Sequence, residues 1–93
     1  MQIETISDFR RAVRNGKYAW PGGYPLFFIT ADCASLSFEA AKQERRQILE
    51  AIRDNANGSG WRVVACEINW EDADLYCAHT GQRIESAYSE EAA

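Results

Sequence analysis

One short apolar segment constrains the fold of this chain more than any other feature. Residues Tyr24–Thr30 read YPLFFIT, a run that is rich in strand-forming residues. Both sets of alternating positions, which would face opposite sides of a strand, are mostly apolar. A strand with two apolar faces belongs in the middle of a sheet, and Pro25 is tolerated only near its start. The segment therefore predicts a central strand, which follows a turn at residues 20–23 (WPGG).

Two helical patterns flank this strand. Thr5 or Ser7 is the candidate cap of a first helix that runs to about Asn15. Ser37 caps a longer helix that residues 57–60 (NGSG) bring to an end. The apolar stripe of the longer helix comprises Phe38, Ala41, Ile48, Leu49 and Ile52. We expect this helix to be continuous and to pack on one face of the sheet.

A second strand and a hairpin follow the long helix. The strand is expected over Trp61–Asn69, with Val64, Cys66, Ile68 and Trp70 on one face by parity. The connection back to Tyr24–Thr30 has the length of a crossover, which favours a parallel pairing of the two strands. Segments Leu75–Ala78 and Gln82–Glu85 flank residues 79–81 (HTG) and predict a hairpin.

These elements predict a single small α+β domain over residues 1–93. We expect a sheet of three to five strands, one long helix packed on one face, a short N-terminal helix and a frayed tail from about residue 89. Ninety-three residues suffice for one modest core. The residues expected to be buried in it are Phe28, Ile48, Ile52, Val64 and Ile68. The start of the chain lacks a secretory apolar region, so a reducing cytoplasm is the expected location and the cysteines are expected as free thiols.

Charge is distributed unevenly along the chain. Residues 1–20 carry four basic and two acidic groups, residues 21–66 carry five of each, and residues 67–93 carry seven acidic groups and one basic group, which sum to −4. A net-acidic chain lacks the basic patch that binds nucleic acid or anionic membranes, so neither is an expected direct partner. The acidic end suits a basic protein surface instead, although the alternative is that it only maintains solubility.

Candidate metal ligands are present but poorly spaced. They are Cys33, Cys66, Cys77 and His79. Structural zinc sites use close pairs such as C-x2-C, and here only Cys77 and His79 are close in sequence. We therefore expect no metal or cofactor. A nucleophilic Cys77 with His79 as base is a further alternative, but a hairpin tip offers no pocket, so no catalytic residue is assigned and the chain is not expected to be an enzyme.

An aromatic and acidic stretch provides the candidate partner-binding residues. Glu71, Asp72 and Asp74 lack the spacing and glycine of a calcium loop, so a solvated acidic loop is expected. Aromatic anchors ringed by charges are typical of protein interfaces. The predicted partner-binding residues are Trp70, Glu71, Asp72, Asp74, Tyr76 and His79.

The segments YPLFFITAD and NWEDADLYCAHTGQRIESAY resemble a group of small uncharacterised proteins of bacterial phages, plasmids and integrated elements. In these relatives the last twelve residues read C-x-H-C-G-x-R-I-x-S-A-Y, and a C-x2-C pair stands at the positions of Ser37 and Ala40. The resemblance covers about residues 20 to 90 and implies a zinc knuckle with two cysteine pairs. This chain keeps Cys77 but has Thr80, Ser37 and Ala40 at the other three positions. It therefore resembles a degenerate knuckle without zinc.

The leading functional expectation is a non-catalytic, acidic protein-binding module. The resemblance implies an accessory or inhibitory protein of a bacterial mobile element, including the anti-CRISPR kind that occupies nucleic-acid-binding surfaces. Its partner would be a protein with a basic or nucleic-acid-binding surface. The alternatives are a metal-binding structural or regulatory module related to zinc knuckles, and a small enzyme that uses Cys77 or His79.

Overall fold

Strand β2 (Tyr24–Thr30) lies at the centre of the sheet. The computed structural model describes residues 1–88, so the tail expected to fray from residue 89 lies outside the described residues. β2 pairs with β1 (Tyr18–Ala19), β3 (Ser35–Leu36) and β4 (Val63–Ile68). Within residues 1–88 this makes a four-stranded antiparallel sheet with helices, so the predicted α+β class and the central position of β2 are confirmed.

The predicted parallel pairing of β2 and β4 is wrong. The two strands are antiparallel, with Leu26 opposite Ile68 and Thr30 opposite Val63. The cause is β3, because the chain turns back after β2 and forms β3 antiparallel to it before the helices begin. The helices then return the chain to the end of β2, and β4 has to run in the opposite direction.

Helix α1 (Ile6–Asn15) begins and ends as the sequence predicts. Thr5 is its cap, because the Thr5 hydroxyl accepts a hydrogen bond from the Asp8 N–H and the Asp8 carboxylate accepts one from the Thr5 N–H. Both bonds satisfy backbone donors that the first helical turn leaves open. At the other end Gly16 adopts a φ of 92°, a conformation that favours glycine.

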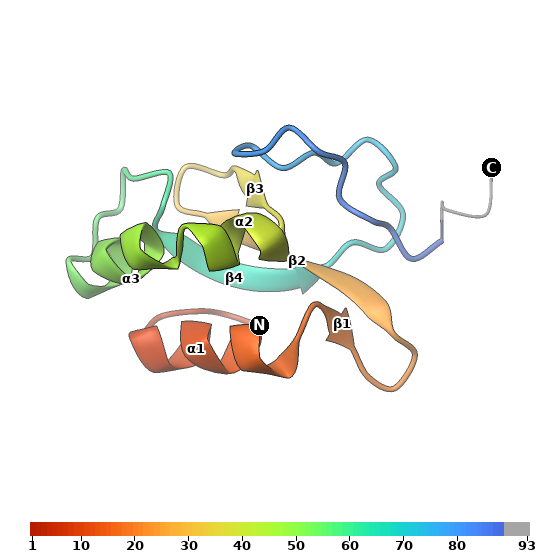
Figure 1. The fold of residues 1–93 in the computed structure, drawn as a ribbon, viewed down its shortest axis with the longest axis horizontal. Helices are drawn as coiled ribbons and strands as arrows, with labels where there is room; N and C mark the ends of the chain where they lie inside the picture. The colour runs from red at the N-terminus through yellow and green to blue at the C-terminus, as the bar shows by residue number, and fades with distance from the viewer. Residues whose placement is uncertain (89–93) are drawn as a thin grey trace.

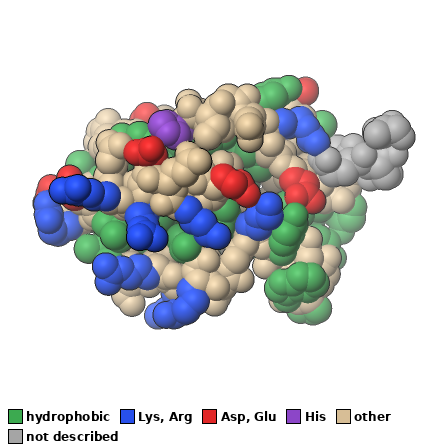
Figure 2. Space-filling model, in the orientation of Figure 1, with side chains coloured by type: hydrophobic (Ala, Val, Ile, Leu, Met, Phe, Trp, Pro, Cys, Tyr) green, Lys and Arg blue, Asp and Glu red, His purple; other side chains and the backbone are tan. Residues whose placement is uncertain are grey.

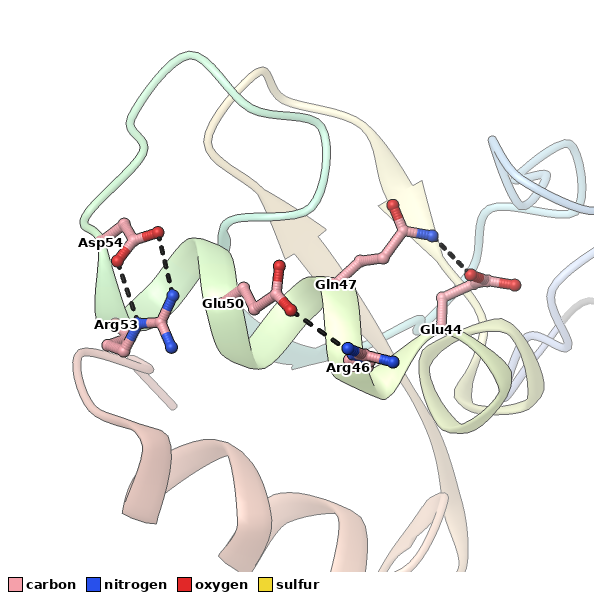
Figure 3. Close-up of polar contacts among 6 residues, drawn as sticks. All are labelled: Glu44, Arg46, Gln47, Glu50, Arg53 and Asp54. Carbon is pink, nitrogen blue, oxygen red and sulfur yellow. Dashed lines mark hydrogen bonds and ion pairs between the residues drawn. The ribbon is translucent and has the colours of Figure 1, made fainter.

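The expected long helix consists of two segments, α2 (Phe38–Gln43) and α3 (Arg45–Arg53). Glu44 separates them with φ −108° and ψ 25°, and its carboxylate accepts a hydrogen bond from Gln47 at 2.6 Å (Figure 3). The apolar stripe nevertheless continues across the break: Phe38, Ala41, Ile48 and Ile52 are buried and Leu49 is half-buried. The two segments therefore act as one layer on the sheet.

The core lies between the helices and one face of the sheet (Figure 1). The ring of Phe28 is fully buried and packs between the rings of Phe9 from α1, at 5.4 Å, and Phe38 from α2, at 4.5 Å. Aromatic pairs at these separations contribute packing beyond their buried area.

The predicted core is correct for Phe28, Ile48 and Ile52 but wrong for two residues of β4. Val64 and Ile68 are only half-buried, whereas Val63 is fully buried. The register with β2 shifts between Ile29 and Thr30, which inserts one extra residue into β4. Such a bulge reverses the parity of the strand beyond it, so that Val63 faces the core in place of its neighbour.

The segment from residue 70 to residue 88 contains no helix or strand longer than a single bridge. Its hairpin matches the prediction, because the Cys77 N–H donates to the Gln82 carbonyl at 2.8 Å and the Ile84 N–H donates to the Leu75 carbonyl at 2.7 Å. Gly81 in its turn adopts a left-handed conformation with φ 76°. Figure 1 shows this segment along the border of the molecule away from α1.

Candidate functional site

Asn69 joins three parts of the chain directly after β4. Its side chain is buried, and its amide nitrogen donates to the carbonyls of Asp72 and Glu85, both at 3.0 Å. Its backbone N–H donates to the Pro25 carbonyl at 2.9 Å, and its own carbonyl accepts from the Ala87 N–H at 2.9 Å. Because buried polar groups need partners, this network fixes the start of β2, the acidic loop and the last described residues against one another.

Three aromatic side chains meet on the surface beside Asn69. The ring of Trp70 lies 4.7 Å from that of Tyr24 and 5.9 Å from that of Tyr88, and it is stacked on the latter at an interplanar angle of 13°. Tyr24 and Tyr88 are themselves 6.3 Å apart. Trp70 is 45% exposed and Tyr88 is 54% exposed. We call Tyr24, Trp70 and Tyr88 the aromatic cluster; contiguous exposed rings of this kind mark interaction sites.

Carboxylates border the aromatic cluster. Glu71, Asp72 and Asp74 are all exposed, and the Asp72 carboxylate accepts a hydrogen bond from the Asp74 N–H at 2.9 Å. The pKa of Tyr88 is raised, first by a hydrogen bond with Tyr24 and further by the negative charge of Glu71. The Tyr88 phenol is therefore neutral at neutral pH, and the surface combines uncharged rings with acidic side chains.

The predicted partner-binding residues fall into separate environments. Trp70 belongs to the aromatic cluster. Tyr76 is exposed on the hairpin, where its backbone forms an isolated antiparallel β-bridge with that of Arg83. The ring of His79 lies 5.2 Å from that of Trp61, and its Nε2 lies 3.5 Å from a carboxylate oxygen of Glu44. The structure thus brings Trp70 together with two tyrosines and places His79 against the helix layer.

The candidate metal ligands do not converge. Cys33 is exposed, and Cys66 is buried in the core, where burial raises the pKa of its thiol to about 11. Within residues 1–88, no group of three or more His, Cys, Asp or Glu side chains is placed to hold a metal ion. The four candidates are therefore not a common ligand set.

Cys77 lies in a polar environment that differs from that of Cys66. Its Sγ accepts a hydrogen bond from the Ser37 N–H at 3.4 Å. Burial alone would raise the pKa of Cys77, but hydrogen bonds with Thr80 and Ser37 outweigh it and lower the pKa to about 7. The Ser37 hydroxyl also accepts from the Ala40 N–H at 3.1 Å. Of the four positions singled out by the resemblance, Ser37 and Thr80 thus hydrogen-bond with the Cys77 sulfur, and Ala40 is joined to them only through the Ser37 hydroxyl.

Cys77 and His79 do not form a nucleophile–base pair in the structure. Among the described residues no hydrogen bond joins them, because the Cys77 sulfur faces Ser37 and Thr80. Cys77 is also only 1% exposed. A nucleophilic pair needs contact between the two side chains and access for a substrate, and this geometry provides neither.

Sequence reasoning did not single out Tyr24 and Tyr88 as site residues. Tyr88 joins the aromatic cluster through a hydrogen bond from its N–H to the Trp70 carbonyl at 2.9 Å, a pairing across 18 positions that no local pattern shows. Trp20 is 75% exposed but lies outside the aromatic cluster.

No helix within residues 1–88 has both the length and the apolar character needed to cross a membrane. Comparison of the chain with protein-family models, with curated proteins and with solved structures finds no match.

Proposed function

We propose that this protein is a non-catalytic binding module that uses the aromatic cluster and the acidic loop Glu71–Asp74 to hold a basic surface of a partner protein. One observation carries the proposal: Trp70 and Tyr88 are stacked and about half exposed, although the same rings would contribute more stability if they were buried. A small domain that keeps large rings on its surface is suited to contribute them to an interface.

The chemistry of the partner follows from the rings and their borders. Arginine and lysine side chains are attracted to the faces of Trp and Tyr rings, and carboxylates nearby add to that attraction. Exposed carboxylates also accelerate the encounter with a positively charged surface. On the resemblance, the partner belongs to a bacterial host, and the module is an accessory or inhibitor encoded by a mobile element.

The test is a quantitative pull-down from bacterial lysate. Immobilised wild-type protein is compared with the double variant Trp70→Ala, Tyr88→Ala, and captured proteins are measured by mass spectrometry. We expect at least one protein with a basic surface to be captured by the wild type and lost by the variant.

A matched control separates the surface from general damage. The variant Trp20→Ala removes a large ring that is 75% exposed and lies outside the aromatic cluster. This control should retain capture, and circular dichroism should show both variants folded. Equal capture by the wild type and by the aromatic-cluster variant contradicts the proposal.

A further inference from the structure

A groove between the helices carries charge opposite in sign to that of the acidic loop. It has an apolar floor, cationic rims and a volume of about 370 Å³. The floor is lined by Phe9, Val13 and Leu49. The rims carry Arg10 and Arg14 from α1, and Lys42 and Arg45 from α2 and α3. We call this feature the helix groove.

Helical spacing makes the helix groove regular. On α1, Arg10 and Arg14 are four residues apart, and so are the floor residues Phe9 and Val13. Side chains at this spacing lie about 5–6 Å apart on one face of a helix. The α1 rim therefore presents two cations one turn apart above an apolar strip, and Lys42 and Arg45 face them from the other side.

Within the part of the chain that the structure describes, the rim cations form no close ion pairs, although Lys42 interacts electrostatically with Glu39. None of the four has a carboxylate within ion-pair distance in residues 1–88. Other cations of α3 do have one: Arg46 pairs with Glu50 at 3.5 Å and Arg53 with Asp54 at 3.0 Å (Figure 3). Figure 2 shows the Lys and Arg side chains gathered over the helices with hydrophobic side chains between them. A ligand in the groove would thus gain ion pairs without breaking existing ones.

We propose that the helix groove binds an acidic amphipathic helix of a partner protein, at a surface distinct from the aromatic cluster. An amphipathic helix lays its apolar face into a hydrophobic groove with anchors spaced three and four residues apart, which matches the floor. Carboxylates that flank this apolar face, four residues apart, would meet the two rims at the same spacing. A nucleic acid or an anionic membrane surface would use the cations but leave the role of the apolar floor unexplained.

The probe is a labelled peptide of about 18 residues, or five helical turns, with leucines on one face and glutamates on both flanks. A scrambled peptide of the same composition keeps the charge but loses the apolar face. Binding to the full chain is measured by fluorescence anisotropy at low and physiological salt. The same titration is run with a single-stranded DNA oligonucleotide and with phosphatidylglycerol vesicles.

Two variants remove the rims and one serves as control. Arg10→Glu with Arg14→Glu reverses the α1 rim, and Lys42→Glu with Arg45→Glu reverses the other. Arg11→Glu with Arg46→Glu makes the same change in net charge at two exposed positions that do not line the groove. Each rim variant should weaken binding of the amphipathic peptide about tenfold or more, which corresponds to about 1.4 kcal/mol, while the control should change it less than about threefold. Thermal unfolding checks that all three variants are folded.

The proposal predicts that the amphipathic peptide binds the wild type and that the scrambled peptide binds at least about tenfold more weakly. It is overturned if the amphipathic peptide does not bind the wild type, or if both peptides bind equally. It is also overturned if the control variant loses as much affinity as the rim variants. Tighter binding of the oligonucleotide or the vesicles than of the peptide would assign the groove to that class of ligand instead.

Discussion

The helix layer and the segment from residue 70 to residue 88 are held in place by different interactions. The helix layer rests on buried apolar side chains such as Phe28 and Ile48. The later segment has almost no regular structure. It adds Cys77 and Ile84 to the same core, and it is further held by hydrogen bonds that buried polar groups make, chiefly the side chains of Asn69 and Cys77. The two regions also differ in charge, since the helix groove is rimmed by cations and the loop Glu71–Asp74 is acidic.

This difference teaches that net charge is a poor guide to partners when the charges are segregated. Eight of the ten Lys and Arg residues lie between residues 10 and 53, while seven of the fourteen acidic residues lie after residue 66. A chain with a net charge of −4 therefore carries a cationic groove as well as an acidic loop. Whether it binds a partner of one sign or of both depends on local surfaces.

The largest effect is expected from substitutions that replace the hydrogen bonds around Cys77 with a zinc site. Ser37→Cys, Ala40→Cys and Thr80→Cys, together with the native Cys77, create two C-x2-C pairs, the spacing of structural zinc sites. We expect the triple variant to bind zinc stoichiometrically and gain on the order of 10 kcal/mol of folding free energy from it. Metal analysis and thermal unfolding with and without chelator measure both.

The wild type is the control for the zinc experiment, and we expect it to remain folded in excess chelator. Zinc binding by the triple variant would support the resemblance to zinc knuckles. A triple variant that folds but takes up no zinc would count against it, because the four positions would then be unable to surround one ion.

The second prediction concerns the helix layer. Ile52 is 6% exposed in the core, so Ile52→Ala should lower the free energy of unfolding by about 2–5 kcal/mol. Chemical denaturation measures the loss. A loss below about 0.5 kcal/mol would mean that the buried stripe of α3 does not support the fold.

The third prediction concerns the segment from residue 70 to residue 88. Asn69→Ala removes the donor to the carbonyls of Asp72 and Glu85 and the acceptor of the Asp72 N–H, and it should cost about 3 kcal/mol because several hydrogen bonds of a buried side chain are lost together. Hydrogen exchange should accelerate at the amides of Ala87 and Tyr88 more than at those of α3. Uniform acceleration across both regions would contradict the separation described above.

The fourth prediction compares two buried thiols. The pKa of Cys77 is lowered from 9.0 to about 7, so its thiolate stabilises the fold at high pH and this contribution is lost as pH falls through about 7. Relative to Cys77→Ser, the wild type should gain about 1–3 kcal/mol between pH 7 and pH 9.

Cys66 provides the matched comparison for this pH dependence. Burial raises its pKa to about 11, so it destabilises the fold as pH rises above about 9 and contributes no gain between pH 7 and pH 9. Denaturation of Cys66→Ser over the same pH range should therefore show the same gain as the wild type. A gain that survives in Cys77→Ser would assign it to another group.

Sequence reasoning predicted the helix layer better than the site because the two depend on different kinds of information. Helical spacing and capping residues locate α1, and apolar spacing gives the buried stripe of α2 and α3, since these patterns are local. The direction of β4 was missed because two residues of β3 reverse the chain, and the burial of Val63 was missed because a bulge changes the parity.

The site was only partly predictable for a related reason. The acidic loop and Trp70 are visible in the sequence because composition is local. The stacking of Tyr88 on Trp70 depends on the Asn69 network, which joins residues far apart in the chain. The sequence alone does not show whether an asparagine is a buried residue with several hydrogen bonds or an exposed turn residue. The helix groove was missed for the same reason, since its rims belong to separate helices.

The smallest expected effect also tests the central proposal most directly. Glu71→Lys, Asp72→Lys and Asp74→Lys reverse the acidic loop, and because all three residues are exposed the fold should be unchanged. The measurement is the association rate with the protein captured by the aromatic cluster, determined by surface plasmon resonance at low and physiological salt. The account predicts slower association for the triple variant, by about tenfold at low salt and less at physiological salt, because the lost attraction is screened. Association rates equal to those of the wild type at both salt concentrations would contradict it.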